Sequence, residues 1–398
     1  MYDGVIMAHT HRIATVAALL FVSLPARGQS PGVKPESIRF TGHRFVADLT
    51  DGGHAELTLD PRLQTSTDDV LRTFQIPYAG AVVVSIPDGR VLAMVGRSAA
   101  DSRLGPADLA LRAWAPSASV FKVVSATALV ESGGVTGATR VCYHGGVSAV
   151  LPDNLVDIPA IDKSCATLAY GIGKSQNAII AKLVTEHLTP ADLLREGRDF
   201  GFGEAIPFEI PVEPSHLDVP ANNKLEMARA SAGFWHSTLS PMHAALLAAT
   251  IANRGEMPTP TLVERAVDGS GRVEQLAVAA PRHVADPEAA ADVGRMMELT
   301  TRIGTAKGTF RNKRGQRLLP VEVAGKTGTL NAETDHGPLG YSWFVGYAPA
   351  DHPTIAFAVV LGNAPNWRIK ATYVGRHIVS EYLNEKTERS GTHLVAAR

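Results

Sequence analysis

The chain has 398 residues, of which 45% are hydrophobic and 19% are charged. These proportions are typical of a globular protein with a sizeable core, and they exclude a disordered, fibrous or coiled-coil chain. Lys and Arg total 38 against 39 Asp and Glu, so the net charge is −1. The chain therefore lacks the positive charge that general nucleic-acid binders and polybasic membrane-surface proteins require.

An apolar run at residues 13–26 follows a short basic segment near the N-terminus. A membrane-spanning helix needs roughly 18 or more apolar residues, whereas the apolar part of a signal peptide has about 7–15. Small residues, Ala26 and Gly28, occupy the positions that a cleavage site before Gln29 would need. We therefore expect residues 1–28 to be a cleaved signal peptide of a periplasmic protein. An uncleaved segment would instead hold the protein at the inner membrane.

Residues 29–40 are rich in Pro, Gly and Ser and are expected to form a linker. A hairpin is expected over 45–60 and a helix over 61–74. Residues 79–96 contain the clearest hairpin, because two apolar β-rich runs flank the turn Pro87-Asp88-Gly89.

Helical spacing of apolar residues then dominates the middle of the chain, and strands return near its end. The predicted helices are 119–132, 175–188, 241–253 and 287–301, followed by strands at 321–330, 341–349 and 354–363 and a helix at 370–384. This order predicts an α/β (α+β) fold with an antiparallel sheet flanked by helices and built from both ends of the chain. A mostly helical subdomain, about 101–318, lies between the two halves.

The expected domain limits follow from these elements. After the signal peptide, a linker and short N-terminal segment would cover 29–55, and one functional domain would cover 56–385. Residues 386–398 are expected to be a flexible C-terminal tail.

The first candidate motif is Ser119-Val120-Phe121-Lys122. In a helix that begins at Ser119, the side chains of Ser119 and Lys122 lie on one face, because residues three apart are neighbours. A serine hydroxyl needs a base within hydrogen-bonding reach to act as a nucleophile, and a desolvated lysine can lose its proton near neutral pH. The same spacing also arises by chance, so this motif alone is weak.

The second candidate motif is Ser175-Gln176-Asn177. The serine hydroxyl could relay a proton to a leaving amine, and the Asn amide offers both a donor and an acceptor to a substrate peptide bond. The alternative is structural, with Ser175 as the N-cap of the helix predicted over 175–188.

The third candidate motif is Lys326-Thr327-Gly328-Thr329, within a predicted strand. Alternation places Thr327 and Thr329 on one face and Lys326 and Gly328 on the other. Two hydroxyls beside a lysine can bind a carboxylate, and a strand edge offers backbone groups to an extended peptide. The alternative is a solvated lysine among threonines that favour β-structure.

Each motif occurs once, and they follow one another on a predicted helix, loop and strand. This set, with the segment SWFVGYAP at 342–349, resembles the transpeptidase domain of penicillin-binding proteins, in the superfamily that also contains serine β-lactamases. The resemblance runs from about Glu56 to Leu383. It implies a serine D,D-transpeptidase that cross-links peptidoglycan through an acyl-enzyme formed on D-Ala-D-Ala stem peptides. It also implies covalent inhibition by β-lactams.

The resemblance implies catalytic roles for particular residues. Ser119 is expected to be the acylated nucleophile, Lys122 its base and Ser175 a proton shuttle. The backbone N–H groups of Ser119 and Thr329 are expected to form the oxyanion hole. No metal or organic cofactor is expected.

The substrate-binding residues are also implied by the resemblance. Asn177 is expected to position the substrate amide. Lys326 and Thr327 are expected to hold the terminal carboxylate, assisted by Thr329. Gly328, on the same strand, is also expected to be a substrate-binding residue.

Three alternatives stay open from the sequence. The acyl-enzyme could be hydrolysed, as in a D,D-carboxypeptidase or a serine β-lactamase, although no ExxLN segment follows the second motif. The protein could be a penicillin-binding sensor without catalysis. It could also use the same residues as an acyltransferase or peptidase on a different substrate.

Cys142 and Cys165 are the two cysteines of the chain. In an exported protein they are expected to pair, because the compartment is oxidising. The bridge would close a Gly- and Pro-containing stretch that looks poorly structured, just upstream of Ser175. The alternative is two buried free thiols.

A metal site is not expected. The 14 histidines are scattered. His236 and His243 could share a helix face, but no third ligand accompanies them.

Overall fold

The computed structural model describes residues 32–275, 279–334, 337–365 and 368–396. Its main sheet has five antiparallel strands in the order β14-β15-β16-β4-β5. These strands are β4 (Tyr78–Ser85), β5 (Val91–Arg97), β14 (Ala324–Thr334), β15 (Gly337–Ala348) and β16 (Ile355–Asn363). The fold is thus an antiparallel sheet flanked by helices, as the sequence predicts.

The two ends of the chain meet in the middle of this sheet. Strand β16 pairs with β4, from Ile355 opposite Ser85 to Gly362 opposite Tyr78. The prediction that the sheet is built from both halves of the chain is therefore confirmed.

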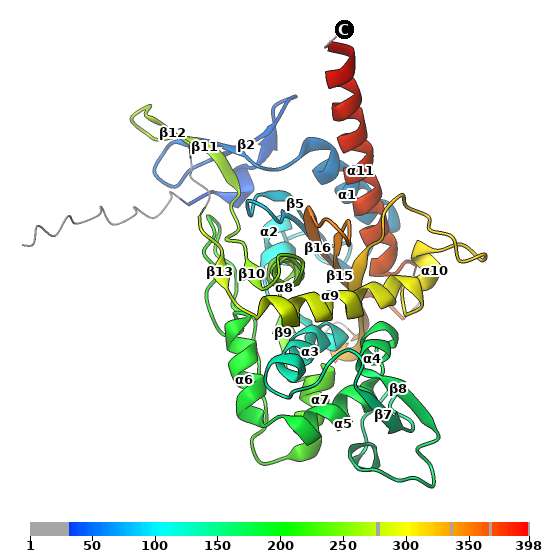
Figure 1. The fold of residues 1–398 in the computed structure, drawn as a ribbon. Helices are drawn as coiled ribbons and strands as arrows, with labels where there is room; N and C mark the ends of the chain where they lie inside the picture. Colours follow the sequence, from blue (N-terminus) through cyan, green and yellow to red (C-terminus); the bar gives the residue numbers. More distant parts are fainter. Residues whose placement is uncertain (1–31, 276–278, 335–336, 366–367, 397–398) are drawn as a thin grey trace, which may run out of the picture.

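Helices cover both faces of the main sheet (Figure 1). Residues 81–84 of β4 alternate between two apolar cores, because successive strand residues point to opposite faces. The smaller core lies under α1 (Pro61–Phe74) and α11 (Ala371–Ala396), and the larger one lies under α8 (Pro241–Ala252) and the helical segment.

Helix α8 shows how the sequence sets an element's ends. The Ser240 hydroxyl accepts a hydrogen bond from the His243 N–H (3.1 Å), and Pro241 takes the first helical position, where its missing N–H costs nothing. The helix ends at Ala252, and Gly255 follows with φ +91°. Its residues from Pro241 to Ile251 are buried, so α8 is a central support of the sheet.

The segment between β5 and β14 is mostly helical and packs mainly on the side of the larger core, whereas its end, residues 306–323, contributes to the smaller core. Helix α9 contacts β14, α3, α4 and α8, and so joins the sheet to this segment (Figure 1). The further helices are α2 (Pro106–Leu111), α3 (Lys122–Glu131), α4 (Leu168–Lys174), α5 (Asn177–His187), α6 (Pro190–Asp199), α7 (Lys224–Ala232), α9 (Pro287–Arg302) and α10 (Lys307–Phe310). Two 3₁₀ turns, η2 (Ala118–Phe121) and η3 (Pro152–Leu155), complete the helical elements.

Three short antiparallel strand pairs also lie in this segment. They are β6 (Ala115–Pro116) with β9 (Thr238–Leu239), β7 (Arg140–Tyr143) with β8 (Ser164–Thr167), and β10 (Glu256–Met257) with β13 (Arg282–His283).

The prediction of a linker over 29–40 is wrong for the residues that the structure describes. From residue 32 the chain forms η1 (Pro35–Ser37) and then a second five-stranded sheet, ordered β1-β2-β3-β11-β12. Its strands are β1 (Arg39–Phe40), β2 (Phe45–Asp48), β3 (His54–Leu57), β11 (Val263–Val267) and β12 (Val273–Gln275). The hairpin predicted over 45–60 is present as β2 and β3. Strand β3 pairs with β11 about two hundred residues later, which local composition does not reveal.

The end of the chain also differs from the prediction. Helix α11 extends to Ala396, so residues 386–396 continue a helix and are not a separate flexible tail. The predicted signal peptide, 1–28, lies outside the described residues. Within the described ranges, no helix combines the length and apolar character needed to cross a bilayer.

Candidate active site

The first motif lies where η2 meets α3. Ser119 is in the 3₁₀ turn and Lys122 is the first residue of α3, so the α-helix begins three residues later than the sequence predicts. The two side chains still meet, because the 3₁₀ turn also brings residues three apart onto one side. The Lys122 Nζ donates a hydrogen bond to the Ser119 Oγ at 2.6 Å.

Lys122 is fully buried and its ammonium group has three acceptors. Besides Ser119, its Nζ donates to the Asn177 Oδ1 (2.6 Å) and to the Ala232 carbonyl (2.9 Å). Burial, followed by the nearby charge of Lys326, lowers the pKa of Lys122 well below its usual range. A buried lysine whose acceptors are all uncharged is poised to act as a neutral base.

The second motif lies in the turn between α4 and α5. Ser175 follows the last residue of α4 in the left-handed conformation, with φ +56°. The side chain of Gln176 caps α5, and Asn177 is the first residue of that helix. The alternative of Ser175 as an N-cap is therefore wrong, because it ends one helix rather than starting the next.

The third motif lies on β14, at one edge of the main sheet. Lys326 points to the buried side of this strand, and its Nζ donates to the Ser175 Oγ and to the Thr327 carbonyl, both at 2.8 Å. Burial lowers the pKa of Lys326 to about 7. The Lys326 charge lowers the Lys122 pKa in the same direction as burial does.

The hydroxyl face of β14 is turned toward open space. Thr327 and Thr329 line a cleft, whereas the Lys326 side chain lies behind them. The Thr327 Oγ1 shares a hydrogen bond of 2.6 Å with the Thr305 Oγ1, which comes from the connection after α9. Two hydroxyls in contact, with a cation behind them, form a suitable cradle for a carboxylate.

Two glycines allow close packing around the turn that carries Ser119. A Cβ on Gly233, which has φ +91°, would lie 1.8 Å from the Ala118 carbonyl oxygen. A Cβ on Gly328 would lie 3.2 Å from the Cβ of Ala118. These glycines let α7 and β14 press on the turn that carries Ser119, which fixes the direction of its N–H groups.

The three motifs meet in a cleft of about 540 Å³, a size suited to a small peptide. The predicted residues that line it are Ser119, Ser175, Asn177, Thr327, Gly328 and Thr329. Additional residues that the sequence did not single out are Val147, Ser148, Lys174, Gly233, Phe234, Thr305, Asn331, Trp343 and Lys370. Of these, Thr305 had a usable signal, because it lies in the Gly-rich segment IGTAKGTF at 303–310.

The charge of this cleft is one-sided. Among the described residues that line it, Lys174 and Lys370 are exposed cations, and none is Asp or Glu. The cleft therefore favours an anionic ligand.

The two candidate histidines lie apart from each other. His243 is buried in α8 with its Nε2 at 2.8 Å from the Phe200 carbonyl, whereas His236 pairs with Glu226. Within the described part of the chain, no cluster of His, Cys, Asp and Glu has the arrangement of a metal site.

Residues 79–381 match the family described as the penicillin binding protein transpeptidase domain. The match covers more than half of the chain and contains all three motifs. The chain belongs to this family.

Curated relatives of this penicillin-binding transpeptidase chain are distant. It is 27% identical over 389 residues to peptidoglycan D,D-transpeptidase PbpA of Mycobacterium tuberculosis, covering 87% of this chain and 75% of the relative. Stage V sporulation protein D of Bacillus subtilis is 24% identical, over 79% of this chain and 50% of that protein.

Solved structures share the fold. PBPA from Mycobacterium tuberculosis superimposes with a TM-score of 0.69 at 23% identity, over 83% of each chain. Its imipenem acyl-enzyme complex gives a TM-score of 0.66 at 24% identity, over 83% of this chain and 80% of that one. The predicted fold and family are therefore confirmed.

Proposed function

We propose that the protein is a serine D,D-transpeptidase that cross-links peptidoglycan stem peptides outside the cytoplasm. The observation that carries the proposal is the contact between the buried amine of Lys122 and the hydroxyl of Ser119 at 2.6 Å. Family membership and the transpeptidase names of the relatives support it.

Acylation follows from the two hydroxyl–lysine pairs. Neutral Lys122 accepts the Ser119 proton as the Oγ attacks the penultimate D-alanyl carbonyl carbon. The N–H groups of Ser119 and Thr329 donate to the oxygen of the tetrahedral intermediate. As the peptide C–N bond breaks, Ser175 delivers a proton to the departing D-alanine nitrogen and can regain one from Lys326, to which it is hydrogen-bonded.

Substrate placement uses the remaining residues of the cleft. The hydroxyls of Thr327, Thr305 and Thr329 receive the terminal carboxylate, and the Lys326 charge attracts it from behind. The Asn177 amide positions the substrate peptide bond, as the family resemblance implies.

An amine of a neighbouring stem then attacks the acyl carbon and passes its proton through Ser175 to Lys326. The Lys122 ammonium returns a proton to the Ser119 Oγ as the ester C–O bond breaks, which leaves the new cross-link and the starting protonation states.

β-Lactams are expected to acylate the same serine, since they present a strained amide next to a carboxylate. Two of the similar structures, of penicillin-binding protein A from Mycobacterium tuberculosis, are acyl-enzyme complexes with such compounds.

The test combines a fluorescent penicillin with a pentapeptide donor and an acceptor amine. Ser119→Ala is expected to lose all covalent label and all D-alanine release, because the nucleophile is gone. Ser66→Ala, on the distant helix α1, is the matched control and should keep both. Intact-mass and peptide mapping measure the adduct, and label on another residue of the Ser119→Ala variant would refute the assignment.

The product distinguishes the remaining alternatives. Transpeptidation yields a cross-linked dimer, a carboxypeptidase yields the tetrapeptide, and a sensor yields the penicilloyl adduct without release of D-alanine. Rapid loss of the penicilloyl adduct to water would instead indicate a β-lactamase.

A further inference from the structure

The loop between β7 and β8 forms part of the cleft wall although none of the three motifs lies in it. We call residues 144–163 the disulfide loop, because the Cys142–Cys165 bridge closes it at its base. Val147 and Ser148 of this loop line the cleft together with Ser119. The Val147 side chain is 83% exposed, an unusual position for an apolar group that has no packing role.

The disulfide loop holds Asn177 by two hydrogen bonds. The Asn177 backbone N–H donates to the Gly146 carbonyl, and its Nδ2 donates to the Val147 carbonyl, both at 3.1 Å. The Oδ1 of the same side chain accepts from Lys122. The approach is close, since a Cβ on Gly146 would lie 2.4 Å from the Ala178 Cβ. The backbone at 146–148 therefore helps to set the direction of the Asn177 amide.

A buried lysine anchors the loop to the same helix that begins at Asn177. Lys182 of α5 is 3% exposed, and its Nζ donates to the Cys142 carbonyl (2.9 Å), the Asp162 Oδ2 (2.9 Å) and the Asp157 Oδ1 (3.1 Å). Asp162 also accepts from the Ile158 N–H at 2.8 Å. Two carboxylates of the loop and one carbonyl of β7 thus converge on one ammonium group.

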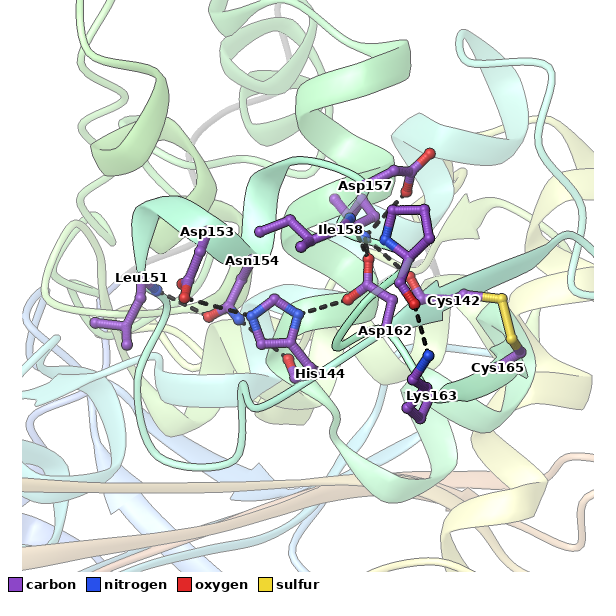
Figure 2. Close-up of polar contacts among 12 residues, drawn as sticks. Cys142, His144, Leu151, Asp153, Asn154, Asp157, Ile158, Asp162, Lys163 and Cys165 are labelled. Carbon is purple, nitrogen blue, oxygen red and sulfur yellow. Dashed lines mark hydrogen bonds and ion pairs between the residues drawn. A yellow bond between two sulfur atoms is a disulfide. The ribbon is translucent and has the colours of Figure 1, made fainter.

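His144 carries this network toward the cleft. Figure 2 shows its ring between Asp153 and Asp162, with Nδ1 bonded to Asp162 and Nε2 3.4 Å from the Asp153 Oδ2. Its carbonyl accepts from the Asn154 Nδ2 at 3.0 Å. His144 is two residues before Gly146. The linked side chains of Lys182, Asp162 and His144 therefore end beside the segment that contacts Asn177.

Such a network contributes more to a defined conformation than to stability. Burying an ion pair costs desolvation energy that its attraction roughly offsets, and we infer that this network acts by selecting one geometry of the loop. The loop contains two glycines with positive φ, Gly145 and Gly146, and without anchors its backbone would sample many conformations. The anchors hold 146–148 in place before any substrate binds, which lowers the ordering cost of binding.

We propose that Val147 and Ser148 form a specificity-determining contact with the stem peptide, and that Lys182 and Asp162 are positioning residues that hold this contact on Asn177. The inference rests on the proposed function, because it assigns the substrate contact of the same cleft. The Val147 side chain packs on the aliphatic part of a stem residue upstream of the D-Ala-D-Ala end. Ser148 offers a hydroxyl to the peptide backbone.

The test compares two donors that share the reacting end. One is a stem pentapeptide and the other is a short N-acyl-D-Ala-D-Ala, which lacks the upstream residues. Val147→Gly is expected to lower the ratio of their kcat/KM values roughly tenfold, the effect of losing one apolar side-chain contact. Lys182→Met is expected to lower the same ratio by a similar factor.

The double variant separates positioning from a general structural effect. If Lys182 acts through Val147, the variant with both substitutions loses about tenfold and not about a hundredfold, because the second change removes a contact already lost. Multiplicative losses would refute the positioning role. An unchanged ratio in Val147→Gly would refute the contact itself.

Controls address folding and the proposed function. Leu71→Ala in α1 removes a buried side chain behind the sheet and should lower thermal stability without changing the donor ratio. If Lys182→Met does not fold, Asp157→Asn replaces it, because this change weakens the same anchor at an exposed carboxylate. Combining Asp157→Asn with Val147→Gly then tests the positioning role in the same way. Wild-type protein that takes no penicillin at Ser119 would contradict the proposed function, whereas normal labelling with an unchanged ratio contradicts only this inference.

Discussion

Two buried lysines, each hydrogen-bonded to a different serine, set the electrostatics of this site. Lys122 has three neutral acceptors and Lys326 has two, and within the described ranges no carboxylate is a hydrogen-bond partner of either ammonium group. Burial therefore favours the neutral amine in both, and the Lys326 charge adds to this effect in Lys122. The proposed mechanism uses Lys122 as the neutral base and Lys326 as the cation.

This difference predicts an alkaline loss of activity. The pKa of Lys326 is lowered to about 7, so its cation is present below that pH and is lost above it. The kcat/KM for a carboxylate-bearing donor should therefore fall as pH rises through about 7, because kcat/KM reports the free enzyme. A pH series of D-alanine release measures the alkaline limb.

Lys326→Arg is the control for that assignment. A guanidinium stays charged throughout this range, so the remaining activity should lose its alkaline limb near pH 7. If the kcat/KM of this variant still fell at the same pH, the loss of activity would belong to another ionisable group.

At the residue scale, the sequence predicts which side chains carry the chemistry, but it does not predict their environment. The motifs and the family resemblance point to Ser119, Lys122, Ser175 and Lys326 from residue types and spacing alone. The burial of these side chains could not be predicted, because it depends on α7, α9 and β14 packing around them. The short hydrogen bond between the two hydroxyls of Thr305 and Thr327 likewise joins residues from separate elements.

At the scale of elements, local signals predict most helices and strands. The helix over 61–74 has the predicted bounds, and α8 ends one residue before the prediction. The turn between α4 and α5 differs from the prediction, because a serine before a helix resembles an N-cap whether or not a second helix ends there. The order of the disulfide loop could not be predicted from its composition, since that order comes from side chains such as Lys182 and Asp162.

The Cys142–Cys165 bridge is predicted from the sequence and is present. Its two cysteines face each other on β7 and β8. Replacing both by Ser should lower the free energy of unfolding by about 3 kcal/mol, as expected for closing a loop of this length in the unfolded chain. Thermal unfolding should show a fall of roughly 4 °C in Tm for a chain of this size.

Penicillin labelling of Ser119 is the second readout for the paired Ser variant. The bridge joins β7 and β8, and neither Ser119 nor Lys122 lies on these strands, so the labelled fraction should match that of the wild type below the transition. Equal Tm values for the wild type and the paired Ser variant would contradict this prediction. They would show that the segment between residues 142 and 165 keeps its loop in the unfolded chain even without the bridge.

On the scale of the whole molecule, one sheet separates two apolar cores, and the cleft lies at the sheet's β14 edge. The smaller core is closed by α11, which buries Val374, Ile378 and Val379 against the sheet. Ile378→Ala should lower the free energy of unfolding by about 2–5 kcal/mol through the cavity that it leaves. Ile303→Ala, at a side chain that is 42% exposed, is the matched control and should cost far less. Denaturant unfolding measures both.

The folded fraction of the Ile378→Ala variant should still react with penicillin at the wild-type rate. Its side chain packs on the face of the sheet away from the nucleophile, in the smaller core. A slowed reaction of folded protein would indicate that the smaller core controls the position of β14.

The pairing of β16 with β4 also sets the order of events during synthesis. Strand β4 leaves the ribosome early, but its partner β16 is among the last segments made. The hairpin of β4 and β5 therefore cannot join the rest of the sheet until nearly the whole chain has been synthesised. Contacts between such distant segments form slowly, because the intervening chain must first be brought together. A growing chain of this kind stays without its central sheet throughout translation, and an unfolded chain is the form that can be threaded across a membrane.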